Sequence, residues 1–233
     1  MKCARGEVHL WRIELDSPPI SLKSLETTLS YQERVKANRL RSPQMRKRWV
    51  VGRGAMRQIL GAYARLEPHS LVLKTATYGK PYLSWPVIGI PFNFSHTRDL
   101  ALLAVSSGCR VGVDAEFVQS IAELEKISRR FFAAPEADEI TALAPEARLS
   151  AFFACWTRKE AFVKALGRGL YAPLDRFRVT VKAEEPPRLV SADWCEPSTW
   201  TFADVGEPGI AATIAVNEFA PVVRRFEFGP TSN

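Results

Sequence analysis

The segment Gly-Val-Asp-Ala-Glu at 112–116 carries two carboxylates, Asp114 and Glu116, two positions apart. Side chains at that spacing on a strand point to the same face, so the two acids would lie close together. Neighbouring carboxylates repel unless a proton or a cation lies between them, and oxygen ligands of this kind suit a hard divalent ion. On this segment alone a solvated strand end is the commoner explanation, so the pair is a candidate metal site that needs further ligands.

A third acid, Glu160, lies in the segment Trp-Thr-Arg-Lys-Glu-Ala-Phe-Val-Lys-Ala that begins at Trp156. Trp156, Glu160 and Lys164 are spaced four residues apart and would form one stripe on a helix. Apolar residues on the same segment would bury much of that helix, and charged groups beside an apolar surface need partners. An ion pair between Glu160 and Lys164 is one explanation. A metal ion on Glu160 and a phosphate on Lys164 would satisfy both groups more fully.

A polar segment, Phe-Asn-Phe-Ser-His-Thr at 92–97, would present the Ser95 hydroxyl and the His96 imidazole to a phosphate. A Ser95 nucleophile with His96 as its base is the competing hypothesis, although adjacent side chains rarely point at each other. The sequence contains no G-x-S-x-G nucleophile elbow, no P-loop and no G-x-G-x-x-G. The common motifs of serine hydrolases and nucleotide-binding folds are therefore missing.

The elements that must position these groups mix helices and strands throughout the chain. The first half is predicted to contain a strand at 8–13, helices at 22–40 and 44–63 interrupted by Pro43, an extended stretch at 91–94, and strands at 100–106 and 110–117. The second half is predicted to contain helices at 121–132, 135–143 and 150–166, the last with Ser150 as N-cap and Gly167 as stop, and strands at 177–181, 200–204, 210–216 and 222–228. We therefore expect an α+β fold of two halves, 1–117 and 118–233.

The composition of the 233 residues, 46% hydrophobic and 24% charged, is that of an ordinary globular protein. No apolar run is long enough to span a membrane, and the first 15 residues lack the apolar segment of a signal peptide, so we expect a cytoplasmic protein. Four cysteines lie far apart without a C-x-x-C pair, and only three histidines are present. These counts argue against a zinc ribbon, a disulfide framework and a multi-histidine metal site.

The net charge is +7, and nine basic residues lie between Arg34 and Arg57. Such a stretch attracts anions, which include nucleic acids, phosphorylated small molecules and acidic proteins. The stretch lacks regular aromatic interleaving and any recognisable nucleic-acid module. Charge alone therefore does not identify the partner.

Taken together and in order, these segments resemble the 4'-phosphopantetheinyl transferases, specifically the long surfactin-synthetase-activating (Sfp) type. The resemblance covers residues 48–177 and rests on the basic helix with Arg48, Tyr-Gly-Lys-Pro at 78–81, Phe-Asn-Phe-Ser-His at 92–96, Gly-Val-Asp-Ala-Glu at 112–116, Arg-Phe-Phe at 130–132 with Glu136, Trp-Thr-Arg-Lys-Glu-Ala-Phe-Val-Lys-Ala-Leu-Gly at 156–167, and Gly-Leu-Tyr-Ala-Pro-Leu-Asp-Arg-Phe at 169–177. Their order and spacing make chance a poor explanation. The first 40 residues match nothing in detail, so the residues that contact adenine stay unassigned.

The resemblance implies two similar α/β halves in a pseudo-twofold arrangement, with coenzyme A in the cleft between them. It implies Mg-dependent transfer of the 4'-phosphopantetheine arm of coenzyme A to a serine of an apo acyl or peptidyl carrier protein, with release of adenosine 3',5'-bisphosphate. It assigns Mg²⁺ to Asp114, Glu116 and Glu160. The coenzyme A contacts that it implies are Arg48 towards the 3'-phosphate, Arg53, Lys80, Ser95, His96, Asp114 and Lys164.

The chemistry of such a transfer needs a base for the carrier serine and positive charge for the diphosphate. Glu160, Glu136 and a metal-bound water are all open as the base, and Lys164 would stabilise the charge that develops on the diphosphate. Carrier proteins are acidic around the accepting serine, which suits a basic enzyme.

Two other hypotheses remain open. A nucleic-acid-binding protein would use the basic stretch at 34–57 and bind in a salt-sensitive way. A non-catalytic partner of carrier proteins would keep the fold without the chemistry, and the complete set of three acids speaks against it. The sequence does not identify the carrier or its pathway. A pseudodimer within one chain favours a monomer.

Overall fold

The computed structural model describes residues 1–167, 169, 172–218 and 220–229. The first half contains β1 (Glu7–Glu14), α1 (Leu22–Thr27), α2 (Tyr31–Asn38), α3 (Pro43–Ala64), β2 (Val72–Thr75), β3 (Pro81–Trp85), β4 (Phe92–Thr97) and β5 (Leu100–Ser106). The second half contains β6 (Val111–Phe117), α4 (Leu124–Phe131), α5 (Ala134–Ala142), α6 (Pro145–Leu166), β7 (Phe177–Val179), β8 (Leu189–Ala192), β9 (Thr201–Asp204), β10 (Ile210–Val216) and β11 (Val222–Glu227). Residues 170 and 171 of the motif at 169–177 lie outside the described residues. No helix within these ranges has the length and apolar character that a membrane crossing requires.

The two halves repeat one order of elements. Each half has a strand, two short helices, a 22-residue helix, a 3₁₀ turn, a two-stranded hairpin and two further strands. The strand order β1-β5-β4 in the first sheet matches β6-β10-β9 in the second. The two similar halves that the family resemblance implies are thereby confirmed, while their division at residue 117 stays a prediction about folding units. The last strand, β11, returns to the first half and pairs in parallel with β1.

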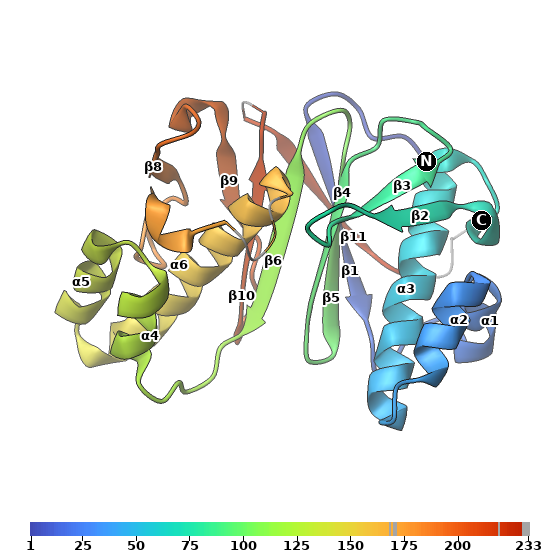
Figure 1. Cartoon of the computed structure of the whole chain (residues 1–233), viewed down its shortest axis with the longest axis horizontal. Helices are drawn as coiled ribbons and strands as arrows, with labels where there is room; N and C mark the ends of the chain where they lie inside the picture. The colour runs from blue at the N-terminus through green and yellow to red at the C-terminus, as the bar shows by residue number, and fades with distance from the viewer. Residues whose placement is uncertain (168, 170–171, 219, 230–233) are drawn as a thin grey trace.

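The two sheets lie between the helices, as Figure 1 shows, with α3 outside one sheet and α6 outside the other. Apolar residues of the two sheets form a shared core between them, made mainly of Val8, Leu10, Leu102, Val111, Val113, Ala115 and Ile214. A second core lies between α3 and the first sheet, and a third between α6 and the second sheet. The two halves are therefore joined by a continuous apolar layer.

A buried ion pair recurs at the same place in each half. Glu33 pairs with Arg57 and Glu136 pairs with Lys159, and both cations are the fifteenth residue of their 22-residue helix. Each acid also accepts the main-chain N–H three residues earlier, and each cation donates to carbonyl oxygens of the 3₁₀ turn that follows its helix. Removing one partner of such a pair costs about 3–5 kcal/mol, because a buried charge is left unpaired. We infer that the pairs lock the short helices onto the long one in both halves.

Strands predicted at 100–106 and 210–216 are confirmed at those bounds, and Gly167 ends α6 in a left-handed conformation as expected. The helix predicted at 22–40 is wrong as a single element, because α1 ends at Thr27 and the Ser30 side chain caps a separate α2. Pro43 does not interrupt a helix. It is the first residue of α3, where its missing N–H costs no hydrogen bond.

The N-cap predicted at Ser150 is also wrong. Helix α6 begins at Pro145, and the Ser150 hydroxyl donates within the helix to the carbonyl oxygen of Ala147. The hairpin β2–β3 and the strand β8 were not predicted, because these short strands are mostly exposed and show no clear apolar alternation.

Candidate functional site

Helix α6 crosses β6 at Gly112, and the approach leaves no space for a side chain. A Cβ atom on Gly112 would lie 2.0 Å from the carbonyl oxygen of Ala161 and 2.4 Å from the main-chain nitrogen of Ala165. Glycine is therefore required there by close backbone approach. Because side chains alternate along β6, the next residues on the helix-facing side are Asp114 and Glu116. The crossing thus places both acids beneath α6.

Asp114 is almost fully buried, with 3% of its surface exposed. One carboxylate oxygen, Oδ1, accepts hydrogen bonds from the Lys164 ammonium at 2.5 Å and from the Ser95 hydroxyl at 3.0 Å. The other oxygen, Oδ2, is buried and has no hydrogen-bond partner among the described residues. A buried carboxylate oxygen without a partner is costly, so this atom points to a ligand for Asp114.

Glu116 and Glu160 complete the set of three acids, and both are only partly exposed. Burial and the negative charge of Asp114 raise the pKa of Glu116 to about 7, although the indole N–H of Trp156 donates to its carboxylate. Burial and the charge of Asp114 also raise the pKa of Glu160. The stripe predicted for Trp156, Glu160 and Lys164 therefore faces the two acids of β6.

The donor set fits Mg²⁺, which prefers carboxylate oxygens and retains several waters. A cation bound here would give Asp114 Oδ2 a partner and would lower the raised pKa values of the two glutamates. Ligand atoms of the three acids do not all lie within 4.8 Å of one another, so the acids would have to move closer together to share one ion. The first half has no counterpart. Strand β1 carries Trp11 at the position that corresponds to Asp114. The two positions correspond because Trp11 pairs with the central residue of β5 and Asp114 pairs with the central residue of β10.

Strand β4 runs beside β6 and is joined to it by side chains instead of a main-chain ladder. The side-chain oxygens of Asn93, Ser95 and Thr97 accept the main-chain N–H groups of alternate β6 residues at 2.8, 3.3 and 3.0 Å. Ser95 thus contacts β6, Asp114 and Lys164 at once. The sequence analysis identified Ser95 but missed the roles of Asn93 and Thr97. The polar residues at every second position of 93–97 were the available signal.

His96 points to the opposite side of β4 from Ser95 and is exposed. Desolvation by the neighbouring protein lowers the pKa of His96, and the positive charges of Lys164 and Arg48 lower it further. Arg48 holds Asp16 through two hydrogen bonds of 2.7 Å. Three predicted anion-binding residues, Arg48, His96 and Lys164, therefore lie within electrostatic range of one another.

Lys80 and Arg53 engage protein groups. The Lys80 ammonium donates to the main-chain oxygens of Val111 and Lys164 at 2.9 and 2.7 Å, and burial, with Arg110 adding to it, lowers the pKa of Lys80 to about 8. Arg53 pairs with Glu33, beside the buried pair of the first half. Their contacts with coenzyme A stay predictions.

The basic stretch at 34–57 has acidic partners within the molecule for four of its nine cations, and it keeps a net positive charge. Its arginines at positions 46, 48, 53 and 57 pair with Glu26, Asp16 and Glu33. The nucleic-acid hypothesis gains no support from this arrangement.

Glu136 lies in the buried pair of the second half. Its oxygens accept hydrogen bonds from Val179 N–H at 2.7 Å and Ala133 N–H at 2.9 Å, and its ion pair with Lys159 measures 2.7 Å. Both side chains of the pair are fully buried. A carrier serine would have no access to Glu136 without opening the helices around it.

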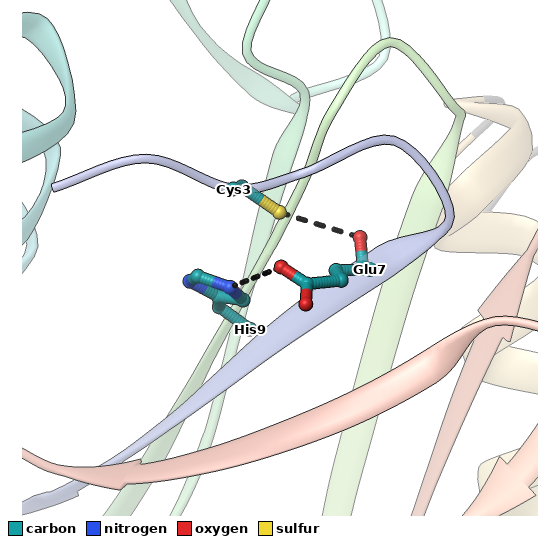
Figure 2. Close-up of side chains that lie close together, drawn as sticks. All are labelled: Cys3, Glu7 and His9. Carbon is teal, nitrogen blue, oxygen red and sulfur yellow. Dashed lines mark hydrogen bonds and ion pairs between the residues drawn. The ribbon is translucent and has the colours of Figure 1, made fainter.

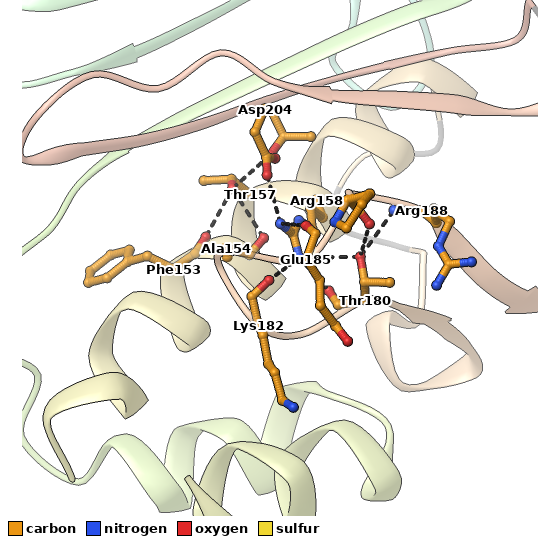
Figure 3. Close-up of polar contacts among 11 residues, drawn as sticks. Phe153, Ala154, Thr157, Arg158, Thr180, Lys182, Glu185, Arg188 and Asp204 are labelled. Atoms are coloured by element: carbon orange, nitrogen blue, oxygen red, sulfur yellow. Dashed lines mark hydrogen bonds and ion pairs between the residues drawn. The ribbon is translucent and has the colours of Figure 1, made fainter. Parts of the chain in front are cut away.

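Arg158 and Thr157 hold α6 in place, and sequence reasoning missed both roles. The Arg158 guanidinium is fully buried and donates to carbonyl oxygens of the segment 180–185 and to the carboxylate of Asp204 at 2.7 Å. Thr157 contacts the hydroxyl of Thr213, which donates to the same aspartate. Figure 3 shows these groups converging around Arg158. We infer that they fix the rotation of α6 and hence the direction of Glu160 and Lys164.

Comparison with known proteins identifies relatives over most of the chain. The profile of the 4'-phosphopantetheinyl transferase superfamily matches residues 110–215. The 4'-phosphopantetheinyl transferase HetI of Nostoc sp. (strain PCC 7120) is 37% identical over 91% of this chain and 89% of its own length. The 4'-phosphopantetheinyl transferase Sfp of Bacillus subtilis is 29% identical over 74% of this chain and 76% of its own.

Proposed function

We propose that this chain, which belongs to the 4'-phosphopantetheinyl transferase superfamily, transfers the 4'-phosphopantetheine arm of coenzyme A to a serine of an apo carrier protein. The observation that carries the proposal is the buried Asp114 carboxylate at the junction of β4, β6 and α6, with Lys164 on one oxygen and the other oxygen unpartnered. A group that combines a metal ion with a diphosphate would fill this site.

Asp114, Glu116 and Glu160 would hold the Mg²⁺ ion, with the unpartnered Oδ2 of Asp114 as one ligand atom. The bound ion would neutralise negative charge on the diphosphate oxygens. Because Mg²⁺ would relieve the repulsion between the acids, it would also lower the raised pKa values of the two glutamates.

Lys164 would bind the diphosphate directly. Its ammonium already lies between Asp114 and Ser95, at 2.5 Å from the first and 3.0 Å from the second. An ammonium in that position stabilises the charge that develops on phosphate oxygens as the bond to the leaving group breaks. Arg48 and His96 belong to the first half and would bind the remaining phosphate of coenzyme A.

The reaction replaces the phosphoanhydride bond of the coenzyme A diphosphate by a phosphoester bond to serine. The serine oxygen of the carrier attacks the phosphorus atom next to the pantetheine arm, and the bond from that phosphorus to the bridging oxygen breaks. Adenosine 3',5'-bisphosphate leaves with the bond electrons, and the serine proton passes to a base. We assign the base to Glu160, since Glu136 is enclosed in its pair with Lys159. A carboxylate has two oxygens, so one could face the metal ion while the other accepts the proton.

The partner of this reaction would be an acyl or peptidyl carrier protein. The net charge of +7 would favour encounter with an acidic partner. A cytoplasmic location and a monomeric state are predictions that rest on the sequence alone.

Transfer assays with two variants test the proposal. Asp114→Ala and Glu160→Ala are each expected to abolish transfer of labelled phosphopantetheine to an apo carrier protein, with circular dichroism unchanged. Asp138→Ala removes an exposed acid of the same half and is expected to retain full transfer. Undiminished transfer in both site variants would refute the assignment of the site.

A further inference from the structure

A second cluster of candidate metal ligands lies in the first half, at the start of the chain. One atom each from the Cys3 thiol, the Glu7 carboxylate and the His9 imidazole all lie within 4.8 Å of one another. Figure 2 shows the His9 ring directed at the Glu7 carboxylate, with the Cys3 sulfur close to the main chain of Glu7. Cys3 and His9 are buried, whereas Glu7 retains some contact with solvent. Most of the cluster is thus buried, and solvent reaches it at Glu7.

The spacing of the His9 and Glu7 atoms fits two ligands of one metal ion. Nitrogen and oxygen ligands about 2.0–2.1 Å from a tetrahedral zinc ion lie ~3.3 Å apart. The distance from His9 Nε2 to Glu7 Oε2 is 3.3 Å. Sulfur, nitrogen and oxygen together are the ligands of a borderline-soft ion of the zinc type, and they are a poor set for Mg²⁺.

The other ring nitrogen of His9 and the other carboxylate oxygen of Glu7 already have hydrogen-bond partners. His9 Nδ1 lies 2.6 Å from the hydroxyl of Tyr63, which also accepts the indole N–H of Trp11 at 3.1 Å. The second oxygen of Glu7, Oε1, accepts a hydrogen bond from Arg224 on β11. Metal-binding histidines usually donate their other ring N–H in this way, which fixes both the tautomer and the ring orientation.

The cluster is separate from the candidate active site. It lies on β1 and the segment before it, whereas the three acids belong to β6 and α6. His9 occupies the position of Gly112 in the repeat, as their pairing with Val105 and Ala215 shows, so the second half has no equivalent imidazole. We propose that Cys3, Glu7 and His9 bind a zinc-type divalent cation, with a fourth coordination position open to water.

Such an ion would tie the first residues of the chain to β1. It would also link β1 to α3 through Tyr63 and to β11 through Arg224. Its function would be to stabilise the first half, with no part in the transfer chemistry.

Cobalt titration of the full-length, untagged chain tests this proposal. The buffer contains a large excess of Mg²⁺, so that the three acids of the other site are not available to cobalt. One equivalent of Co²⁺ is expected to produce a sulfur-to-cobalt charge-transfer band, and Zn²⁺ is expected to abolish it by displacement. Cys3→Ser and His9→Gln should remove the band, whereas Cys109→Ser, which changes a cysteine outside the cluster, should retain it. Tyr63→Phe should weaken binding by about 10- to 100-fold, because only the support of His9 is lost.

A second measurement needs no variant. Alkylation of Cys3 and Cys109 in the wild-type chain is monitored by peptide mass spectrometry. Zn²⁺ is expected to slow alkylation of Cys3 and to leave alkylation of Cys109 unchanged. Absence of a charge-transfer band in the wild type would overturn the proposal. So would a band that persists in Cys3→Ser, or equal alkylation of Cys3 with and without Zn²⁺.

Discussion

Substitution of Gly112 by alanine would separate the two elements that carry the candidate site. The added Cβ would lie 2.0 Å from the carbonyl oxygen of Ala161, on the main chain of α6, where no side-chain rotation can relieve the clash. Real Cβ contacts are essentially never shorter than 3.0 Å, so α6 must move away from β6 by about 1 Å. Overpacking of this kind costs about 1–3 kcal/mol, and a displacement of ~1 Å at an active site can cost about 100-fold in rate.

Two measurements on Gly112→Ala check this reasoning. Urea unfolding should show a loss of about 1–3 kcal/mol, and kcat/KM for transfer should fall by about 100-fold at a temperature where the variant is folded. Gly229→Ala is the matched control, because its Cβ would find only one atom, at 4.0 Å. A folded Gly112→Ala protein with wild-type kcat/KM would show that the close approach of α6 to β6 does not set the geometry of the site.

Three further predictions concern the acids and the buried pair. Glu160→Gln is expected to lower kcat by about 100- to 10,000-fold with little change in melting temperature, and a wild-type kcat would exclude Glu160 as the base. Lys159→Met is expected to lower the unfolding free energy by about 3–5 kcal/mol, because Glu136 keeps a buried unpaired charge, and adding Glu136→Leu should recover part of that loss in urea unfolding. Without Mg²⁺, the unfolding free energy is expected to fall as the pH rises from 4.5 to about 7. The pKa of Glu116 is raised from 4.5 to about 7 in the folded state, so over this range the folded protein keeps a proton on Glu116 that the unfolded chain has released. Thermal melts across that range should show the fall in the wild type and a flatter profile in Glu116→Gln.

The candidate metal site could be predicted from sequence because its residues follow simple periodicities. Asp114 and Glu116 are two apart on a strand, and Glu160 and Lys164 are four apart on a helix, so each pair shares a face wherever the element packs. The structure places the two faces against each other. What the sequence did not reveal is the crossing at Gly112, because that glycine is required by a contact with residues about 50 positions later in the chain.

Some predicted site residues also make contacts within the protein that no local pattern encodes. Glu136 has the same residue type and motif context as a catalytic acid, yet a buried lysine and two main-chain N–H groups surround it. Lys80 was expected along the nucleotide, and its ammonium binds main-chain oxygens of two elements. The repeat of the two halves could not be seen in the sequence, because residues at equivalent positions, such as Trp11 and Asp114, differ in chemistry.

Transfer to an apo carrier protein, followed by mass spectrometry, tests the central claim most directly. The chain is incubated with coenzyme A, Mg²⁺ and several apo acyl and peptidyl carrier proteins, and adenosine 3',5'-bisphosphate is measured in the same samples. We predict that at least one carrier gains a single phosphopantetheine group on serine, with an equal amount of bisphosphate released, and that Asp114→Ala abolishes both products. No gain of mass on any carrier in the presence of Mg²⁺, or equal modification by the wild type and Asp114→Ala, would contradict this account.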